Sequence, residues 1–177
     1  MQMRKSDIQE LAVKLIRTDE ALKVAQNDIK NGCWYAISMH PIWAWLITHR
    51  YCDIDNRKWA TLWRGRTLIH ANGSMQMRDY EDAFKFAVSI DVKLATLIPS
   101  FVDCQKLKGH ILGSVELVEV CPKPTASYVG SPWQCEGFYG LKMAHQRTYK
   151  TPVAQRGNVG IFKIDEVLNP IIKDLEA

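Results

Sequence analysis

The stretch ILGSVELVEV, residues 111–120, predicts the fold of this chain more clearly than any other part of the sequence. β-Branched residues recur through it, and it has the length of one strand, so we predict a strand there. Stretches of similar character predict further strands at residues 34–38, 63–71, 139–143 and 159–164. Gly65, within residues 63–71, marks either a bulge or a close approach of backbone.

Three stretches between and after these strands predict short helices, at residues 42–50, 80–90 and 167–175. The first is rich in tryptophan and leucine, the second is amphipathic, and the third carries Pro170 near its start. Short strands interrupted by short helices and Gly/Pro turns favour an α+β fold around a small β-barrel or curled sheet with flanking helices. The predicted strands do not alternate strictly with long helices, which argues against a doubly wound parallel sheet.

The chain begins with a segment that we predict to be an N-terminal helical extension, residues 1–31, ahead of one domain at residues 32–177. Ser6 followed by Gln9 is typical of a capping box, and Gly32 suits a helix C-terminus. Apolar residues recur with helical spacing at Ile8, Leu11, Ala12, Leu15, Ile16, Leu22, Ala25 and Ile29. This single apolar stripe can pack on the domain or against a second subunit, so a homodimer is a candidate assembly.

Composition limits the class of protein. A length of 177 residues suits one domain, and 47% hydrophobic with 24% charged residues is ordinary for a globular chain. The formal charge of +4 permits a polyanionic partner without requiring one, so any nucleic-acid site must be a local basic patch. No apolar h-region follows the polar first residues, and no run reaches the ~18 apolar residues of a membrane span.

Cysteine and histidine spacing favours a cytoplasmic protein without a metal or cofactor. The cysteines are Cys33, Cys52, Cys104, Cys121 and Cys135. Their number is odd and no CxxC pair occurs, so we interpret them as reduced thiols. The five histidines lack zinc-like spacing, and phosphate-binding glycine loops and a GxSxG elbow are absent. A Cys–His catalytic pair stays open, because such partners meet only in space.

Three polar-rich segments carry a resemblance to a known family. They are ISMHPIWAWLI (37–47), DIDNRKW (53–59) continuing through WRGRTLIHA (63–71), and SPW (131–133) with GFYG (137–140), PV (152–153) and RGNVGIF (156–162). In order and spacing these segments, with GSVELV (113–118), resemble the ASCH family, whose fold is PUA-like. The resemblance covers about residues 35–164 and implies a PUA-like barrel whose cleft binds RNA or a nucleotide-like ligand.

The family's G-x-K-x-x-E-x-R stretch falls on residues 50–57, where only Arg57 is identical. Some ASCH members hydrolyse an acylated cytidine with that lysine, the position three residues later and a glutamate on a later strand. These positions correspond to Cys52, Asp55, and Glu116 or Glu119. A thiol does not replace an ammonium as a point charge. Other members resemble ribonucleases or nucleic-acid-binding modules.

Aromatic and basic residues supply candidate contacts to a nucleic acid. The aromatic candidates, each next to polar or Gly/Pro segments, are Trp43, Trp59, Trp133 and Tyr139. Bases stack on such rings, although tryptophan more often packs in a core, where we assign Trp34, Trp45 and Trp63. The basic candidates are Arg57, Arg64 and Arg66, with Lys58 nearby. They either contact phosphate or form a solvated face with a local aspartate.

Other polar residues complete the candidate site. Asp55 can accept a hydrogen bond from a base's exocyclic amine, or pair with Arg57. Asn56 either assists or holds its turn, and His70 is a general acid or base, or a structural histidine. The remaining candidates are His40 at the helix start and a loop with Ser131 and Trp133 that can close over ligand.

We therefore expect an RNA-binding or modified-nucleoside-binding module. The alternative is a small hydrolase, either a ribonuclease or an amidohydrolase, with Asp55, Arg57, His70 and Glu116 as its acid–base groups. A third hypothesis is a protein-interaction role for the N-terminal helix.

Overall fold

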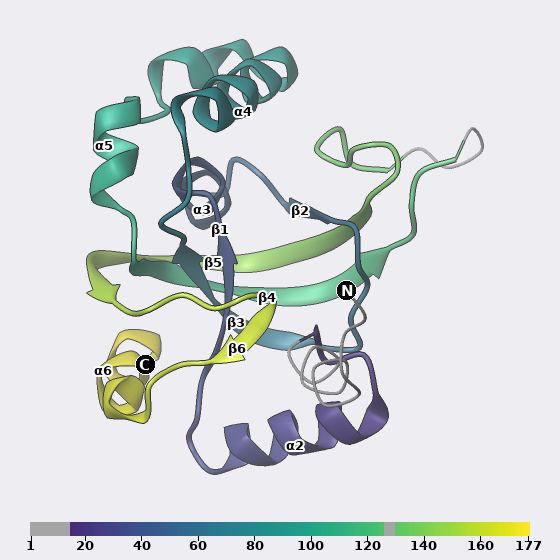
Figure 1. Ribbon diagram of the computed structural model, residues 1–177, viewed down its shortest axis with the longest axis vertical. Helices are drawn as coiled ribbons and strands as arrows, with labels where there is room; N and C mark the ends of the chain where they lie inside the picture. Colours follow the sequence, from purple (N-terminus) through teal and green to yellow (C-terminus); the bar gives the residue numbers. More distant parts are fainter. Residues whose placement is uncertain (1–14, 126–129) are drawn as a thin grey trace, which may run out of the picture.

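The computed structural model describes residues 15–125 and 130–177, which form a mixed α+β fold (Figure 1). In this part of the chain a six-stranded curled sheet has the strand order β2-β5-β4-β3-β1-β6. The strands are β1 (Tyr35–Met39), β2 (Ile54–Arg57), β3 (Gly65–Ala71), β4 (His110–Cys121), β5 (Tyr139–Ala154) and β6 (Ile161–Lys163). Strands β1 and β3 are parallel and the other neighbours are antiparallel. The predicted α+β class is thus confirmed.

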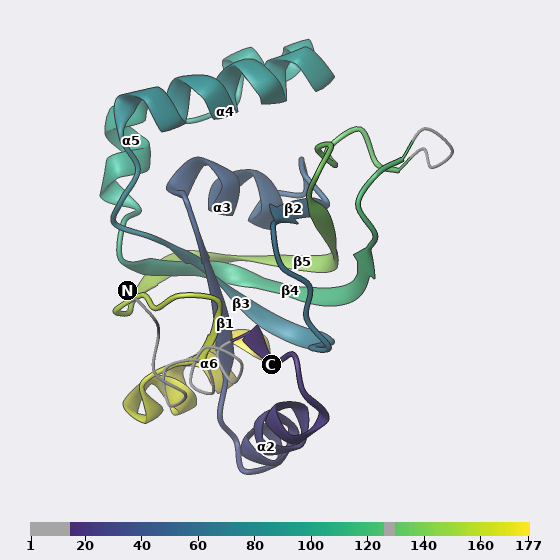
Figure 2. The same ribbon diagram turned by 45° about the vertical axis from the view of Figure 1, so that its right-hand side comes forward.

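Helices cover both sides of the sheet. They are α2 (Asp19–Lys30), α3 (Pro41–Thr48), α4 (Met77–Ile90), α5 (Phe101–Lys106) and α6 (Asn169–Glu176). Figures 1 and 2 show α3, α4 and α5 on one side of the strands, and α2 and α6 on the other. Among the described residues, no helix has both the length and the apolar character needed to cross a bilayer.

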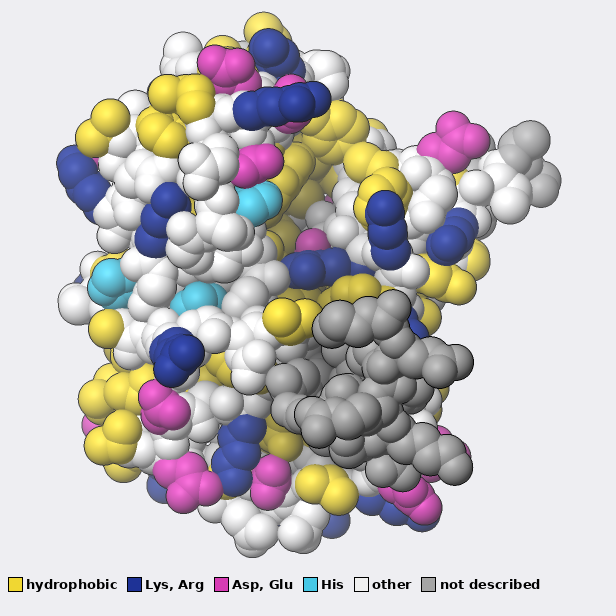
Figure 3. Space-filling model, in the orientation of Figure 1, with side chains coloured by type: hydrophobic (Ala, Val, Ile, Leu, Met, Phe, Trp, Pro, Cys, Tyr) yellow, Lys and Arg dark blue, Asp and Glu magenta, His cyan; other side chains and the backbone are white. Residues whose placement is uncertain are grey.

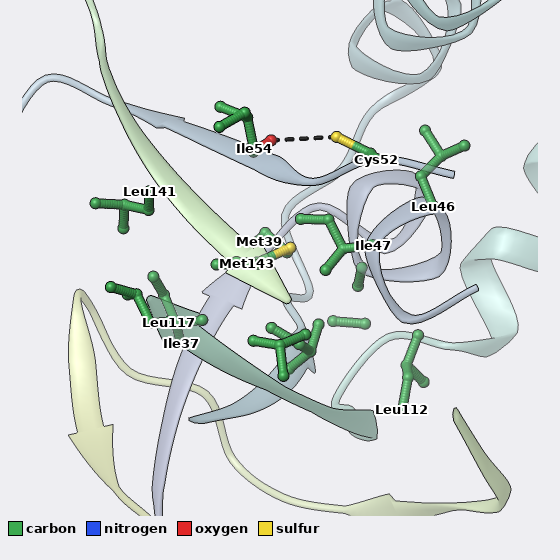
Figure 4. Close-up of a cluster of buried hydrophobic side chains, with 14 of the residues drawn as sticks. Ile37, Met39, Leu46, Ile47, Cys52, Ile54, Leu112, Leu117, Leu141 and Met143 are labelled. Carbon is green, nitrogen blue, oxygen red and sulfur yellow. Dashed lines mark hydrogen bonds between the residues drawn. The ribbon is translucent and has the colours of Figure 1, made fainter. Parts of the chain in front are cut away.

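Helix α3 lies at the centre of the main core. Its sequence is apolar almost all round, as expected for a helix enclosed by other elements, and Ile42, Leu46 and Ile47 have no exposed surface. Figure 4 shows side chains from β1, α3, β4 and β5 meeting in this cluster. Burying each such aliphatic side chain contributes roughly 1.5–3 kcal/mol. The position of α3 is therefore fixed, together with the turn that precedes it.

The prediction of one continuous helix through residues 8–29 is wrong, because the chain is not helical from Ile16 to Thr18. Ile16 has a φ of 49°, and the Thr18 hydroxyl accepts a hydrogen bond from the Ala21 N–H at 3.1 Å, which starts α2 at Asp19. A threonine that caps a helix takes an extended conformation, so the helix begins after it and does not continue from the residues before it. Ala21 and Ala25 pack against the main core. The Ser6–Gln9 capping box lies outside the described residues.

Element lengths also differ from prediction at two strands. Strand β5 runs for 16 residues, well beyond the predicted residues 139–143, because it pairs with β4 through several register shifts that hide its alternation. Strand β2 was predicted as a turn. It is an edge strand with the polar sequence IDNR, held by pairing with β5. Such tertiary pairing outweighs weak strand propensity.

The carboxylate of Glu176 connects the C-terminal helix α6 to the sheet, and we expect it to stabilise this end of the chain. Glu176 is paired with Arg66 Nε at 3.4 Å and Arg147 Nη1 at 3.8 Å, and its side chain is only 7% exposed. The Tyr149 hydroxyl donates to the Glu176 carboxylate at 2.5 Å. Burial and this carboxylate raise the pKa of Tyr149.

We expect Glu176→Ala to lower the free energy of unfolding by about 2 kcal/mol, because it removes the buried carboxylate that pairs with two arginines and accepts the Tyr149 hydroxyl. Urea denaturation measures this. The control is Glu166→Ala, whose side chain is 72% exposed and pairs with Lys163 at 2.9 Å, and which should cost under about 0.5 kcal/mol. Equal losses in the two variants would contradict the assignment.

Candidate functional site

A cleft of about 280 Å³ opens where the end of β1, the first turn of α3 and strand β2 meet. Figure 3 shows a hollow on this face, with hydrophobic side chains above it and acidic and basic side chains on its floor. The cleft is lined by Ser38, Met39, His40, Trp43, Ile47, Ile54, Asp55, Asn56, Arg57, Asn72 and Cys135. The predicted segments at residues 37–47 and 53–59 therefore share one hollow.

Local sequence explains how the cleft walls form. His40 precedes a proline and takes an extended conformation, and Pro41 begins α3 at a position where its missing N–H leaves nothing unpaired. This turn directs His40 and Trp43 toward the cleft. Asp55 and Arg57 are two residues apart on β2, so they share a face of the strand.

Arg57 is held in a fixed geometry on the floor of the cleft. Its Nε donates to Asp55 Oδ2 at 2.7 Å, and its Nη2 donates to the Ser38 carbonyl at 2.6 Å. The guanidinium also lies over the Trp59 ring, 5.5 Å from the centroid. Burial raises the pKa of Asp55, and the Arg57 charge opposes that rise. The pair thus presents a preorganised cation backed by a buried carboxylate.

Two side chains on the opposite wall are suited to a flat heteroaromatic ligand. Trp43 is half-buried and packs edge-on against Phe86 of α4, with ring centroids 6.0 Å apart. The Nδ1 atom of His40 is buried, and no described residue gives it a hydrogen-bond partner. A buried ring nitrogen without a partner is costly unless a ligand or water supplies one.

A second cavity, of about 660 Å³, adjoins the first through Ser38, Arg57 and Asn72. His70 lies in its wall and is only 1% exposed. The Ser38 hydroxyl and His70 Nδ1 are 2.9 Å apart, and His70 Nε2 is 2.9 Å from the Gln155 carbonyl. Because a carbonyl only accepts, Nε2 carries the proton and Nδ1 accepts from the serine. Burial lowers the pKa of His70, which favours this neutral form.

A third hollow, of about 460 Å³, lies beyond Trp59, and the charged residues that the structure describes in its lining are all cations. It is lined by Arg17, Lys58, Trp59, Ala60, Thr61, Leu62, Lys123 and Tyr139. The Lys123 ammonium lies 5.2 Å from the Tyr139 ring centroid, and the Lys58 ammonium lies 5.9 Å from that of Phe138. This surface, which we call the basic groove, thus combines cations with aromatic rings.

The Ser-Pro-Trp loop lies beside the cleft, but its predicted ligand residues face elsewhere. Trp133 is 7% exposed and packs in the main core against Phe86. The Ser131 hydroxyl donates to Asp53 at 2.8 Å. Asn56 holds the loop, since it donates to the Trp133 carbonyl and accepts from the Cys135 N–H, both at 2.8 Å.

The predicted basic cluster is divided between two sides of the molecule. Arg64 donates to the carbonyls of Thr61 and Trp63, and Arg66 pairs with Glu176. Both arginines line a hollow between α2 and α6 that lies apart from the cleft. Arg57 alone of the three reaches the cleft.

The predicted acid–base set does not assemble around one point. Asp55, Arg57 and His70 lie at the two adjoining cavities, but Glu116 is outside both, 46% exposed, with His145 at 3.9 Å. Cys52 is buried, donates to the Ile54 carbonyl at 3.2 Å (Figure 4) and has a pKa raised by burial. It therefore offers neither an ammonium nor a thiolate.

Comparison with known proteins adds no assignment, because no family model matches the chain and no curated protein matches it.

All five cysteines are free. Within residues 15–125 and 130–177, no three His, Cys, Asp or Glu side chains group as a metal site requires.

Sequence reasoning missed Ser38 and Asn72 in the cleft, and Arg17 and Lys123 in the basic groove. A signal for Ser38 was available, because it stands in the same polar-rich segment, residues 37–47, as the predicted ligand residue His40. Nothing in the sequence places Arg17 or Lys123 beside Trp59, since these residues are far apart along the chain.

Proposed function

We propose that this chain is a PUA-like module of the ASCH type that binds single-stranded RNA, with one base in the cleft. The observation that carries this proposal is the Arg57 arrangement, a cation fixed by Asp55 and the Ser38 carbonyl at the floor of an open hollow. The order of the cleft segments along the sequence, which resembles that family, supports the same conclusion.

The cleft has the groups that reading an unstacked base requires. Single-stranded RNA is recognised by stacking on aromatic rings and by hydrogen bonds to base edges. Trp43 offers a ring face or edge, and His40 Nδ1 and the Asp55–Arg57 pair offer polar atoms on the other sides. The cleft volume of about 280 Å³ suits one base with its sugar rather than a longer segment.

The basic groove supplies a path for the backbone of the same strand. Arg57 lines the cleft, and the next two residues, Lys58 and Trp59, line the groove, so the two hollows follow one another along the chain. Lys58 and Lys123 can neutralise phosphates, while Trp59 and Tyr139 can stack neighbouring bases at roughly 1–3 kcal/mol each. A basic local patch also explains how a chain with a net charge of only +4 can bind a polyanion.

Titration of a labelled single-stranded RNA at several salt concentrations tests the proposal. We expect affinity to fall as salt rises, and Lys58→Ala and Lys123→Ala each to reduce the slope of log K against log salt by about 0.7. Lys106→Ala is the matched control, because this exposed lysine of α5 pairs with Asp103 at 2.6 Å and lies outside the groove. A control variant that changes the slope equally would count against the groove.

A free nucleoside should compete for the cleft with little salt dependence, because it carries no phosphate. Direct binding of a nucleoside on its own, together with no binding of RNA, would indicate that the ligand is a free modified nucleoside. Absence of binding by either ligand would refute the proposal.

A further inference from the structure

The second cavity contains a serine and a histidine that the RNA-binding proposal does not use. Ser38 and His70 are direct partners in the β1–β3 ladder, so two central strands fix their separation. The Ser38 hydroxyl is 2.9 Å from His70 Nδ1, and the Gln155 carbonyl accepts from His70 Nε2 at 2.9 Å. A nucleophile beside a base, with that base oriented by a third group, is the arrangement that activates a hydroxyl.

Ser38 and His70 differ in burial, as a nucleophile and its base require. Ser38 is half-buried and lines both cavities, whereas His70 is 1% exposed and lies beneath it. Gly157 covers the pair so closely that an added Cβ would lie 2.5 Å from His70 Cε1 and 3.2 Å from the Ser38 hydroxyl. Ser38 is therefore the more exposed member of the pair, and the nearly complete burial of His70 limits its contact with competing water.

The surrounding charges favour an anionic transition state. Arg57 donates to the backbone carbonyl of Ser38 at 2.6 Å, which fixes its guanidinium beside this residue, and both Arg57 and Arg156 line the second cavity. Cations placed near a developing oxyanion stabilise it most when they are fixed before reaction. The lowered pKa of His70 keeps its Nδ1 free to accept a proton near neutral pH.

We propose that Ser38 is the nucleophile and His70 the general base of an esterase acting on small carboxylic esters in the second cavity. The Ser38 oxygen bonds to the ester carbonyl carbon while its proton moves to His70 Nδ1. The bond from carbon to the leaving oxygen then breaks, and His70 returns the proton to that oxygen, which releases an alcohol. Water attacks the acyl-serine, gives a proton to His70 Nδ1, and the carboxylic acid leaves as Ser38 regains its proton.

The test is reaction of the full chain with an alkyl fluorophosphonate, followed by mass spectrometry of its peptides, and hydrolysis of p-nitrophenyl acetate. We expect an adduct on Ser38 and ester hydrolysis that Ser38→Ala abolishes. His70→Gln should slow both reactions at least about 100-fold, because it removes the general base. Ser89→Ala is the control and should behave as wild type, since the Ser89 hydroxyl donates to the Phe86 carbonyl of its own helix and lines neither cavity.

The wild-type chain alone can overturn the proposal. It does so if Ser38 stays unmodified or if the adduct forms on another residue, whatever the variants do. An adduct on Ser38 that forms equally fast in a folded His70→Gln variant also overturns it, because the serine would then react without the histidine. Neither assay contains RNA, so their failure leaves the RNA-binding proposal standing, and failure of RNA binding leaves this one standing.

Discussion

Arg57→Ala is expected to lower the free energy of unfolding by about 3 kcal/mol at pH 7 and to abolish RNA binding in the cleft. Asp55 is buried, with a side-chain exposure of 10%, and Arg57 is its ion-pair partner at 2.7 Å. Removing one partner of a buried pair leaves an uncompensated charge, which costs about 3–5 kcal/mol. We take the lower end because the Arg57 side chain is itself 21% exposed. Urea denaturation and RNA titration measure the two effects.

The pH dependence separates a charge effect from lost packing. Burial already raises the pKa of Asp55 and Arg57 opposes the rise, so the variant should have a still higher pKa at Asp55. A carboxyl with a raised folded-state pKa binds its proton more tightly when folded, so stability grows as pH falls through that pKa. The deficit of Arg57→Ala should therefore shrink between pH 7 and pH 4.5. A deficit that is constant with pH would show that the ion pair is not its cause.

The double variant Asp55→Asn with Arg57→Ala provides the matched control. It removes the carboxylate charge along with the arginine, and we expect it to be more stable than Arg57→Ala alone at pH 7. It should still fail to bind RNA, because the guanidinium is absent. Recovery of RNA binding in the double variant would contradict the role given to Arg57.

The parts of the fold that were predictable are those with strong local signals. Strand β4 was predicted at residues 111–120 and is His110–Cys121, and its β-branched residues Ile111 and Val115 are fully buried. Strand β2 and most of β5 escaped prediction, since edge pairing and register shifts follow from neighbours that the sequence does not identify. The break at Thr18 escaped it too, because a helical repeat of apolar residues continues in phase across a short interruption.

The site was predictable where its residues are close in sequence. His40 and Trp43 share one turn, and Asp55 and Arg57 share one strand face, so each pair reaches the cleft together. Trp133 could not be placed, because a tryptophan beside polar residues can point inward or outward equally well. The Ser38–His70 pair required knowledge that β1 and β3 are parallel neighbours, which brings together residues 32 positions apart.

Gly113→Ala is expected to destabilise the chain by about 3 kcal/mol, because the backbone of β5 lies too close to Gly113 of β4 to admit a side chain. A Cβ at this position would lie 2.0 Å from the backbone oxygen of Arg147 and 3.1 Å from a methyl carbon of Thr48. A backbone oxygen in a paired strand cannot move without shifting the ladder, so the overpacking cost should reach the upper end of its usual range of about 1–3 kcal/mol. Gly73→Ala is the matched control, since a Cβ there meets nothing within 4 Å and should change stability by under about 0.5 kcal/mol. Urea denaturation of the two variants compares them directly, and a Gly113→Ala protein as stable as Gly73→Ala would mean that β4 and β5 do not approach this closely.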